Sequence, residues 1–302
     1  MPEIKEDSIY LNFIEQAFEL ADAIPRYFSK YSNKIFCNKQ KIVLLVLKQK
    51  LRTTYRDLIE FLKISKISIL IGLNRIPHHT TLVKFAKKIK LNLLNLLLPE
   101  KKADKVAIDY SGFEIENKSY YYRKRFFMLS KRRNFMRTAL LVDLDKQLIL
   151  GSVINYKQGN DNTEFIKLLK NLNVNYVLAD KGYDSRANRK FVFDKVQAIP
   201  QIPFRSISGR DGFVNRTASY FFDQEIYNQR SKVETVFSSI KRKYGSNLRS
   251  KKYSTQRVEV ICKIIAYNVD RLITLYKLLT KGFSRALKNE KDLLVLHIRK
   301  TK

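Results

Sequence analysis

Apolar positions in the first hundred residues recur with the spacing of helices. The pattern predicts helices at 39–51, 53–63, 66–71 and 80–91. Gly72 ends the third of these helices, and Thr80 is expected to be the N-cap of the fourth. Residues 1–100 are therefore predicted to form an all-helical region.

The helix expected at 80–91 is basic as well as amphipathic. Its apolar residues share one face, and Lys84, Lys87 and Lys88 lie outside that face. A short helix, a turn and a basic helix are typical of a helix-turn-helix, so this region is predicted to bind DNA through these lysines. The alternative is an ordinary solvated face, because any amphipathic helix in a lysine-rich chain carries such residues.

After residue 104 the pattern changes to that of strands. Strands are expected at 105–110, 135–144, 147–156, 175–179 and 195–202, and helices at 161–172 and 185–193. The second and third strands flank Asp145 and Lys146, which indicate a hairpin turn. Strands and helices in this order predict a mixed α/β sheet over 101–281. The basic tail 282–302 is expected to be a short helix or a loose end.

Charge narrows the class of partner. The 302 residues carry 59 Lys and Arg against 28 Asp and Glu, a formal net charge of +31. Such an excess favours a polyanion, because contacts with phosphates release condensed counterions. A membrane surface would attract the same charge, but apolar runs such as 91–98 are far shorter than the roughly 20 residues of a membrane-spanning helix.

Cysteine usage and the first residues bear on the compartment. Two cysteines and three histidines are too few for a disulfide framework or a Cys/His zinc site. The start, MPEIKEDSIY, lacks the basic and then apolar pattern of a secretion signal. We therefore expect an intracellular protein that handles nucleic acid and has no membrane partner.

Two aspartates follow apolar strands. Asp109 comes at the end of the strand expected from 105, and Asp180 follows 175–179. Catalytic side chains of open α/β sheets emerge at this edge, although most aspartates at such positions cap turns. Asp184 competes with Asp180 but is better explained as the N-cap of the next helix.

The stretch 227–245, YNQRSKVETVFSSIKRKYG, is expected to be one helix. At about 100° per residue, its Tyr227, Arg230, Glu234 and Lys241 share a narrow stripe beside the apolar face. Glu234 would then be a third carboxylate delivered to the sheet. The alternative is a surface pair of Arg230 with Glu234, which in this order contributes roughly a few tenths of a kcal/mol.

Three carboxylates that converge repel one another unless cations lie between them. Asp109, Asp180 and Glu234 offer only oxygen ligands, which suit Mg²⁺ or Mn²⁺. Two such ions about 4 Å apart can activate water or a 3′-hydroxyl and stabilise the leaving oxygen of a phosphodiester. Arg230 and Lys241 are then expected to hold backbone phosphates.

These motifs resemble those of the DDE transposases of prokaryotic insertion sequences, in the group of families four and five. The signature of that group is Tyr, two residues, Arg, three residues, Glu, six residues and Lys. It is matched in full by Tyr227, Arg230, Glu234 and Lys241. The segments VAIDYSGFE and LADKGYDS match as well, and the resemblance covers roughly 30–280, including RTTYRDLIE and IPHHTTLVKF.

The resemblance implies a ribonuclease H-like catalytic core and two divalent metals. By the match, the metal-binding triad is Asp109, Asp180 and Glu234, and the DNA contacts are Tyr227, Arg230 and Lys241. It further implies a transposase of the prokaryotic cytoplasm, associated with the nucleoid, that binds terminal inverted repeats and transfers a 3′-hydroxyl to target DNA. A homodimer is expected because two ends must be brought together. The interval from Asp180 to Glu234 leaves no room for the β-rich insertion of some relatives.

Alternatives stay open on function and on one segment. A stand-alone metal-dependent nuclease of the same fold would carry the same carboxylates, and a transposase-derived repressor would bind DNA without cleaving it. The basic and aromatic segment 120–134 could be a DNA-binding loop, with rings for stacking, or a further strand with a basic edge.

Overall fold

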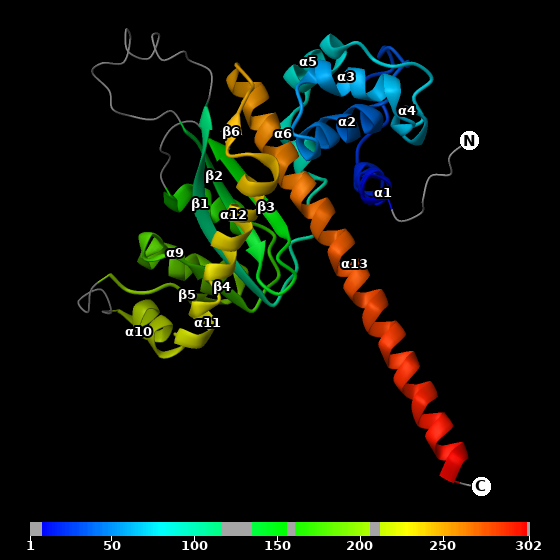
Figure 1. The fold of residues 1–302 in the computed structure, drawn as a ribbon. Coiled ribbons are helices and arrows are strands. Elements are labelled where there is room, and N and C mark those ends of the chain that lie inside the picture. Colours follow the sequence, from blue (N-terminus) through cyan, green and yellow to red (C-terminus); the bar gives the residue numbers. More distant parts are fainter. Residues whose placement is uncertain (1–7, 116–134, 156–160, 206–211, 301–302) are drawn as a thin grey trace.

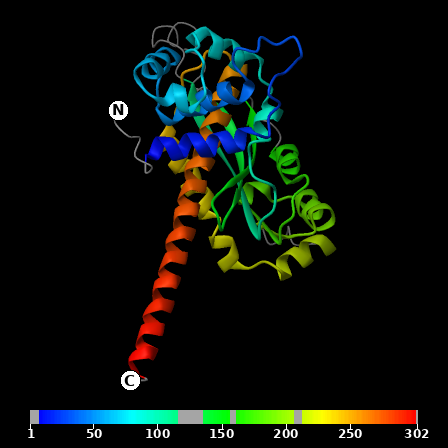
Figure 2. The same cartoon turned by 90° about the vertical axis from the view of Figure 1, so that its right-hand side faces the viewer.

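The computed structural model describes residues 8–115, 135–155, 161–205 and 212–300 (Figure 1). Within these ranges a six-stranded sheet is covered by helices on both faces. A group of short N-terminal helices packs beside the sheet along one long C-terminal helix (Figures 1 and 2). The predicted mixed α/β core with N-terminal helices is confirmed.

Six helices form the part of the N-terminal region that the structure describes. They are α1 (Ile9–Ala21), α2 (Asn38–Lys50), α3 (Tyr55–Ile64), α4 (Ile67–Leu70), α5 (His79–Lys88) and α6 (Leu91–Asn95). Thr80 was wrong as the N-cap of α5, because the helix starts earlier and His78 is the capping residue. The Thr80 hydroxyl instead lies 2.8 Å from the ring Nδ1 of His78, within the first turn.

Reciprocal hydrogen bonds explain where two of these helices begin. The Thr54 hydroxyl accepts the amide of Asp57, and the Asp57 carboxylate accepts the amide of Thr54, both at 3.2 Å. Cys37 and Gln40 form the same arrangement at the start of α2, with sulfur in place of the hydroxyl. Each pair satisfies two amides that a helix start would otherwise leave without partners.

The sheet has the strand order β3–β2–β1–β4–β5, with β6 beside the end of β1. The strands are β1 (Lys105–Ile115), β2 (Phe135–Asp143), β3 (Ile149–Asn155), β4 (Tyr176–Ala179), β5 (Ile199–Gln201) and β6 (Asn247–Leu248). β1, β2 and β3 are antiparallel, whereas β4 and β5 run parallel to β1. This topology is that of a ribonuclease H-like core.

β1 is longer than the sequence predicted. The expected strand ended just after Asp109, whereas β1 continues to Ile115 because β2 pairs with it as far as Glu114 opposite Phe135. The predicted hairpin between β2 and β3 is confirmed. The strand expected at 195–202 is shorter, since a π-helical turn occupies the residues before Ile199.

Two hydrophobic clusters cover the two faces of the sheet. One lies under α8 (Asp161–Leu169) and α9 (Arg186–Phe191), and α10 (Phe213–Tyr220) packs beside α9. The other joins the sheet to α12 (Ser231–Tyr244), to α13 (Tyr253–Lys300) and to the N-terminal helices. The boundary predicted at residue 100 falls between α6 and β1, yet the second cluster is continuous across it.

Helix α13 holds the two parts together. It packs against α1, α2, α5 and α6 on one side and against β3, β6 and α12 on the other. Asp270 on α13 accepts hydrogen bonds from Lys50 of α2 at 2.6 Å and from the Tyr244 hydroxyl of α12 at 2.5 Å. Instead of the predicted separate tail from 282, the helix continues unbroken to Lys300 and extends away from the body in both views (Figures 1 and 2). None of the described helices has the length and apolar character of a membrane span.

The capping pair at the start of α3 gives a stability prediction. Thr54→Ala removes the acceptor for the Asp57 amide and should lower the free energy of unfolding by about 1 kcal/mol. Thr53→Val is the matched control, because the Thr53 hydroxyl is buried without a partner and its loss should cost almost nothing. Urea denaturation of both variants measures the difference, and equal losses would contradict the capping role.

Candidate active site

The register of β1 and β4 places two of the predicted carboxylates at neighbouring positions. Ile108 pairs with Ala179, and this is the last parallel pair before β4 ends. Asp109 and Asp180 are the next residues on the two strands. Because neighbouring strands lie about 4.8 Å apart, Asp109 within β1 and Asp180 just after β4 lie side by side. Asp180 is exposed and its carboxylate accepts the amide of Lys181 at 2.7 Å.

Alternation along β1 decides which face the site occupies. Ile108 and Tyr110 pack into the cluster under α8 and α9, so Asp109, Ser111 and Phe113 point to the opposite face. That face is the one covered by α12. The strand and the helix therefore bring their polar side chains to one edge.

The segment predicted as a single helix at 227–245 is two helices. Tyr227 belongs to α11 (Gln224–Asn228), and α12 starts at Ser231 after a two-residue turn that ends at Arg230. Both turn residues keep right-handed helical dihedrals, and the Arg230 amide bonds to the Tyr227 carbonyl at 2.9 Å, three residues back. The backbone is thus tightened locally between the two helices. Glu234 and Lys241, both on α12, still share the helix face that their spacing predicted.

Arg230 links two of the three carboxylates. Its guanidinium lies 3.3 Å from an oxygen of Asp109 and 2.7 Å from an oxygen of Glu234. The surface pair considered from the sequence is therefore present, and it extends to the strand. The Asp109 side chain is 22% exposed and that of Glu234 is 58% exposed. The edge is thus open to solvent on the side of the helix.

The charges at this edge influence one another. Burial raises the pKa of Asp109, and the charges of Glu234 and Asp180 raise it further, while the Tyr110 amide and Arg230 oppose them. Burial alone would lower the pKa of Arg230, but Asp109 and Glu234 raise it above its usual value. Asp109 is therefore a carboxylate that lacks full compensation for its charge.

Lys241 and Tyr227 complete the predicted signature. The Lys241 ammonium donates to the Ser111 hydroxyl at 2.7 Å and lies 5.8 Å from the centre of the Phe113 ring. Burial lowers the pKa of Lys241, partly offset by Glu114. Tyr227 packs against Phe222 with 5.7 Å between ring centres. Ser111 was missed from the sequence, although its place two residues after Asp109 on a strand is a signal for the same face.

Asp184 has a structural task that separates it from Asp180. Its carboxylate lies 2.6 Å from the guanidinium of Arg189 and accepts the amide of Arg205 at 2.6 Å. It was wrong as an N-cap, since Ser185 holds that position and makes no side-chain cap. Arg189 is 1% exposed, so Asp184 neutralises a buried charge.

The chemistry of the donors suits a divalent cation, but their arrangement is not yet a ligand set. Among the described residues, no group of three His, Cys, Asp or Glu side chains is placed to hold a metal ion. The guanidinium of Arg230 instead supplies the counter-charge for Asp109 and Glu234. A cation at this edge would take over that role from Arg230.

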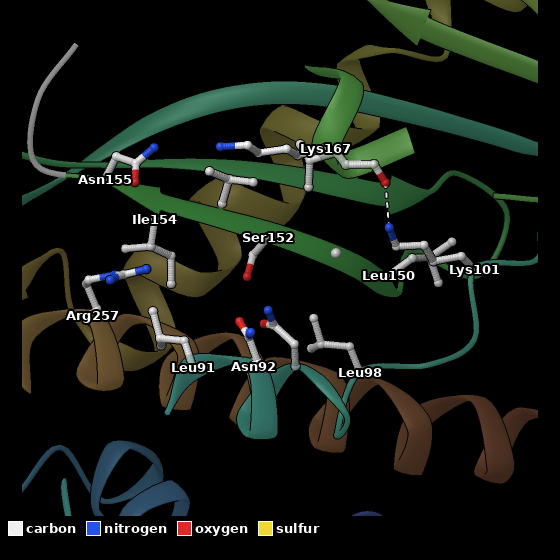
Figure 3. Close-up of a pocket in the computed structure, with 14 residues that line it drawn as sticks. Leu91, Asn92, Leu98, Lys101, Leu150, Ser152, Ile154, Asn155, Lys167 and Arg257 are labelled. Carbon is white, nitrogen blue, oxygen red and sulfur yellow. Dashed lines mark hydrogen bonds between the residues drawn. The ribbon is translucent and has the colours of Figure 1, made fainter. Parts of the chain in front are cut away.

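Other predicted contacts lie elsewhere. Lys84, Lys87 and Lys88 are exposed on α5, as the sequence predicted. The segment 120–134 lies outside the described residues. A cavity of about 480 Å³ follows the edge strand β3, between α6, α8 and α13 (Figure 3). Its described lining includes lysine, arginine and asparagine side chains but no carboxylate, so it is separate from the acidic edge.

A comparison with known families identifies the class of the chain. The fold is of the ribonuclease H-like class, with an acidic edge on its central strands. Residues 100–269 match the family model described as the transposase DDE domain, which is more than half of the chain, and the protein belongs to this family.

One solved structure is similar over most of the chain. It is a cryo-electron microscopy structure of a piggyBac transposase synaptic complex with hairpin DNA. The identity is 10% and the TM-score is 0.43, with 92% of this chain and 74% of that chain covered. No curated protein matches the chain.

The contrast between Asp184 and Asp180 gives a prediction. Asp184→Asn should lower the free energy of unfolding by about 2 kcal/mol or more, because it leaves the buried Arg189 without its charge partner. Asp180→Asn should leave stability almost unchanged, because this carboxylate is exposed and only an adjacent amide bonds to it. Thermal and urea unfolding of the two matched variants test this, and the reverse order would show that the roles have been exchanged.

Proposed function

We propose that the protein is a DNA transposase of an insertion sequence, in the group of families four and five. It would cleave the ends of its element and join the freed 3′-hydroxyl to target DNA. What supports the proposal is that Asp180 neighbours Asp109 on adjacent strands and that Arg230 joins Asp109 to Glu234, in a chain of the transposase DDE domain family. The net charge of +31 suits a polyanionic substrate.

Asp109, Asp180 and Glu234 would hold two divalent ions, Mg²⁺ or Mn²⁺. Such ions, when bound, activate water or a 3′-hydroxyl and stabilise the leaving oxygen. Arg230 would exchange its carboxylate partners for a backbone phosphate, to which its planar fork presents paired donors. Lys241, held beside Ser111, would bind a neighbouring phosphate as a point charge.

The DNA would be double-stranded, with terminal inverted repeats as the specific partner and target DNA as the second. Tyr227 would contact DNA beside Arg230, and Lys84, Lys87 and Lys88 of α5 would contact phosphates. Two copies of the chain would bring two ends together. The expected setting is the cytoplasm and nucleoid of a prokaryotic cell.

Asp109→Asn should reduce cleavage to background and still give a folded protein. The pKa of Asp109 is raised in the folded state, so ionising it above its unfolded pKa costs stability. Neutral Asn removes that cost, and the variant should unfold at a slightly higher temperature at pH 7. Single-turnover cleavage of a labelled duplex, copied from the DNA that flanks the coding sequence, is measured with Mg²⁺ or Mn²⁺. Cleavage at the wild-type rate would exclude the catalytic role.

Residues on α12 should fail in different ways. Glu234→Ala should abolish cleavage at every Mn²⁺ concentration, because a carboxylate ligand is gone. Lys241→Ala should weaken duplex binding about ten- to a hundredfold and leave a residual metal-dependent nick, because only a phosphate contact is lost. Arg230→Lys should not show wild-type binding and cleavage, since a lysine ammonium cannot replace the paired donors of the planar guanidinium.

The same assay separates the alternatives. Nicks without any joined product would favour a stand-alone nuclease. Duplex binding without nicks in the wild type would favour a repressor.

A further inference from the structure

A second cationic site lies where the end of α2, the β6 segment and α13 meet. It is a pocket of about 140 Å³. Its described lining carries Lys48, Arg52, Arg249 and Lys263, against Glu259 as the one carboxylate. These residues come from separate stretches of the chain, so nothing in the sequence draws them together. The excess of positive charge calls for an anionic ligand.

Three donors at this pocket have no acceptor. Lys48 is 5% exposed and Gln49 is 6% exposed. Among the described residues neither side chain forms a hydrogen bond, and the Lys48 ammonium only lies 4.8 Å from the centre of the Tyr55 ring. The Thr53 hydroxyl is likewise buried and without a partner. Of the three, the Thr53 hydroxyl is the buried donor that costs free energy unless a ligand or water completes it.

The carboxylate of the pocket is already engaged. Glu259 accepts the amides of Arg249 and Ser250 at 3.1 and 2.9 Å. Lys263 donates to the carbonyls of Gly245 and Asn247 at 2.7 and 2.8 Å. These contacts shape the pocket wall and leave Lys48 and Arg52 as the cations whose side chains make no hydrogen bond to a described residue.

The backbone at the mouth is held in an unusual conformation. Arg52 has φ 53°, in the left-handed region that costs a residue other than glycine about 1 kcal/mol or more. Gly245 faces it with φ 87°, and a Cβ there would lie 3.4 Å from an Arg52 guanidinium nitrogen. Arg52 is exposed, and its guanidinium makes no hydrogen bond to a described residue. This conformation belongs to the C-terminal cap of α2, where the amides of Arg52 and Thr53 bond to the carbonyls of Gln49 and Lys48, and it places the Arg52 side chain beside Gly245.

The pocket continues the line of cations that begins at the acidic edge. Phe113 lies between the two sites, with its ring centre 5.8 Å from the Lys241 ammonium and 5.6 Å from the Lys263 ammonium. Phe113 follows Asp109 by four residues on the same face of β1, a distance of about 13 Å at 3.3 Å per residue. Phe113 is fully buried beneath α12, so it joins the two sites under the surface and both lie on the same side of the sheet.

We propose that this pocket binds one backbone phosphate of the DNA that the acidic edge processes, with Lys48, Arg52 and the Thr53 hydroxyl as its donors. The inference rests on the proposed function for the identity of the polyanion. It ties the N-terminal helical region, through α2, to the same DNA strand as the catalytic face. Arg52 and Lys48 supply positive charge, and the Thr53 hydroxyl supplies a hydrogen bond that orients the phosphate.

Thr53→Val and Arg52→Gln test the shared phosphate. Each should weaken binding of a short duplex from the flanking DNA about tenfold, and Arg52→Gln should lower the salt slope by about one. The loss of duplex affinity in the double variant should be clearly smaller than the product of the losses in the two single variants, because both side chains bind the same phosphate. The control, Arg56→Gln, removes an equal charge from an exposed position on α3 outside the pocket. When it is combined with Thr53→Val, the two losses of duplex affinity should multiply.

Unfolding temperatures in inorganic phosphate and in chloride, at matched ionic strength, identify the source of the anion. One result would overturn the DNA assignment in favour of a free anion. Phosphate would raise the unfolding temperature of the wild type and not that of Thr53→Val, and the losses of duplex affinity in the two single variants would multiply in the double variant. An unchanged duplex affinity in Thr53→Val would overturn the proposal that this pocket binds a phosphate. Coupled losses on DNA in a protein that never cleaves would support the pocket and reject the proposed function, so the two can fail separately.

Discussion

Parallel pairing between β1 and β4 is the constraint on which the acidic edge depends. Ile108 and Ala179 are locked opposite each other by the ladder, and each strand carries an aspartate at the next position. A shift of one residue in either strand would turn one carboxylate to the face of α8, because side chains alternate along a strand. The positions of the two aspartates are therefore fixed by the pairing of buried valines, alanines and leucines that take no part in chemistry.

Opposite charges are balanced within the chain at this edge. Arg230 sits between Asp109 and Glu234 and lowers the repulsion that the converging carboxylates would create. Asp109 still carries a raised pKa, because burial outweighs the single guanidinium. The edge is thus stable enough to fold and still has unsatisfied negative charge to offer to a cation.

Local signals predicted the parts of the fold that depend on neighbours in sequence. Apolar spacing located α2 and α3, and an aspartate after each apolar strand located Asp109 and Asp180. Predictions failed where a distant partner decides the outcome. β1 runs past Asp109 because β2 pairs with it, and no local pattern reports the length of that ladder.

The spacing of Arg230, Glu234 and Lys241 predicted a shared face, and the contacts agree with it. The break before α12 and the reach of Arg230 to β1 arise from packing, which periodicity does not describe. The pocket at Arg52 and Gly245 was beyond prediction for the same reason, since its members meet only when α2 and α13 pack together.

Helix α13 has a consequence for how the chain is made. The N-terminal helices emerge first during synthesis, but α2 packs its apolar face on α13, and Lys50 of α2 pairs with Asp270 of α13. A nascent or truncated chain that stops before Tyr253 would leave that face uncovered and prone to aggregation. An incomplete product would therefore expose apolar surface that the full-length chain buries, so the N-terminal helices depend on the last part of the chain for their stability.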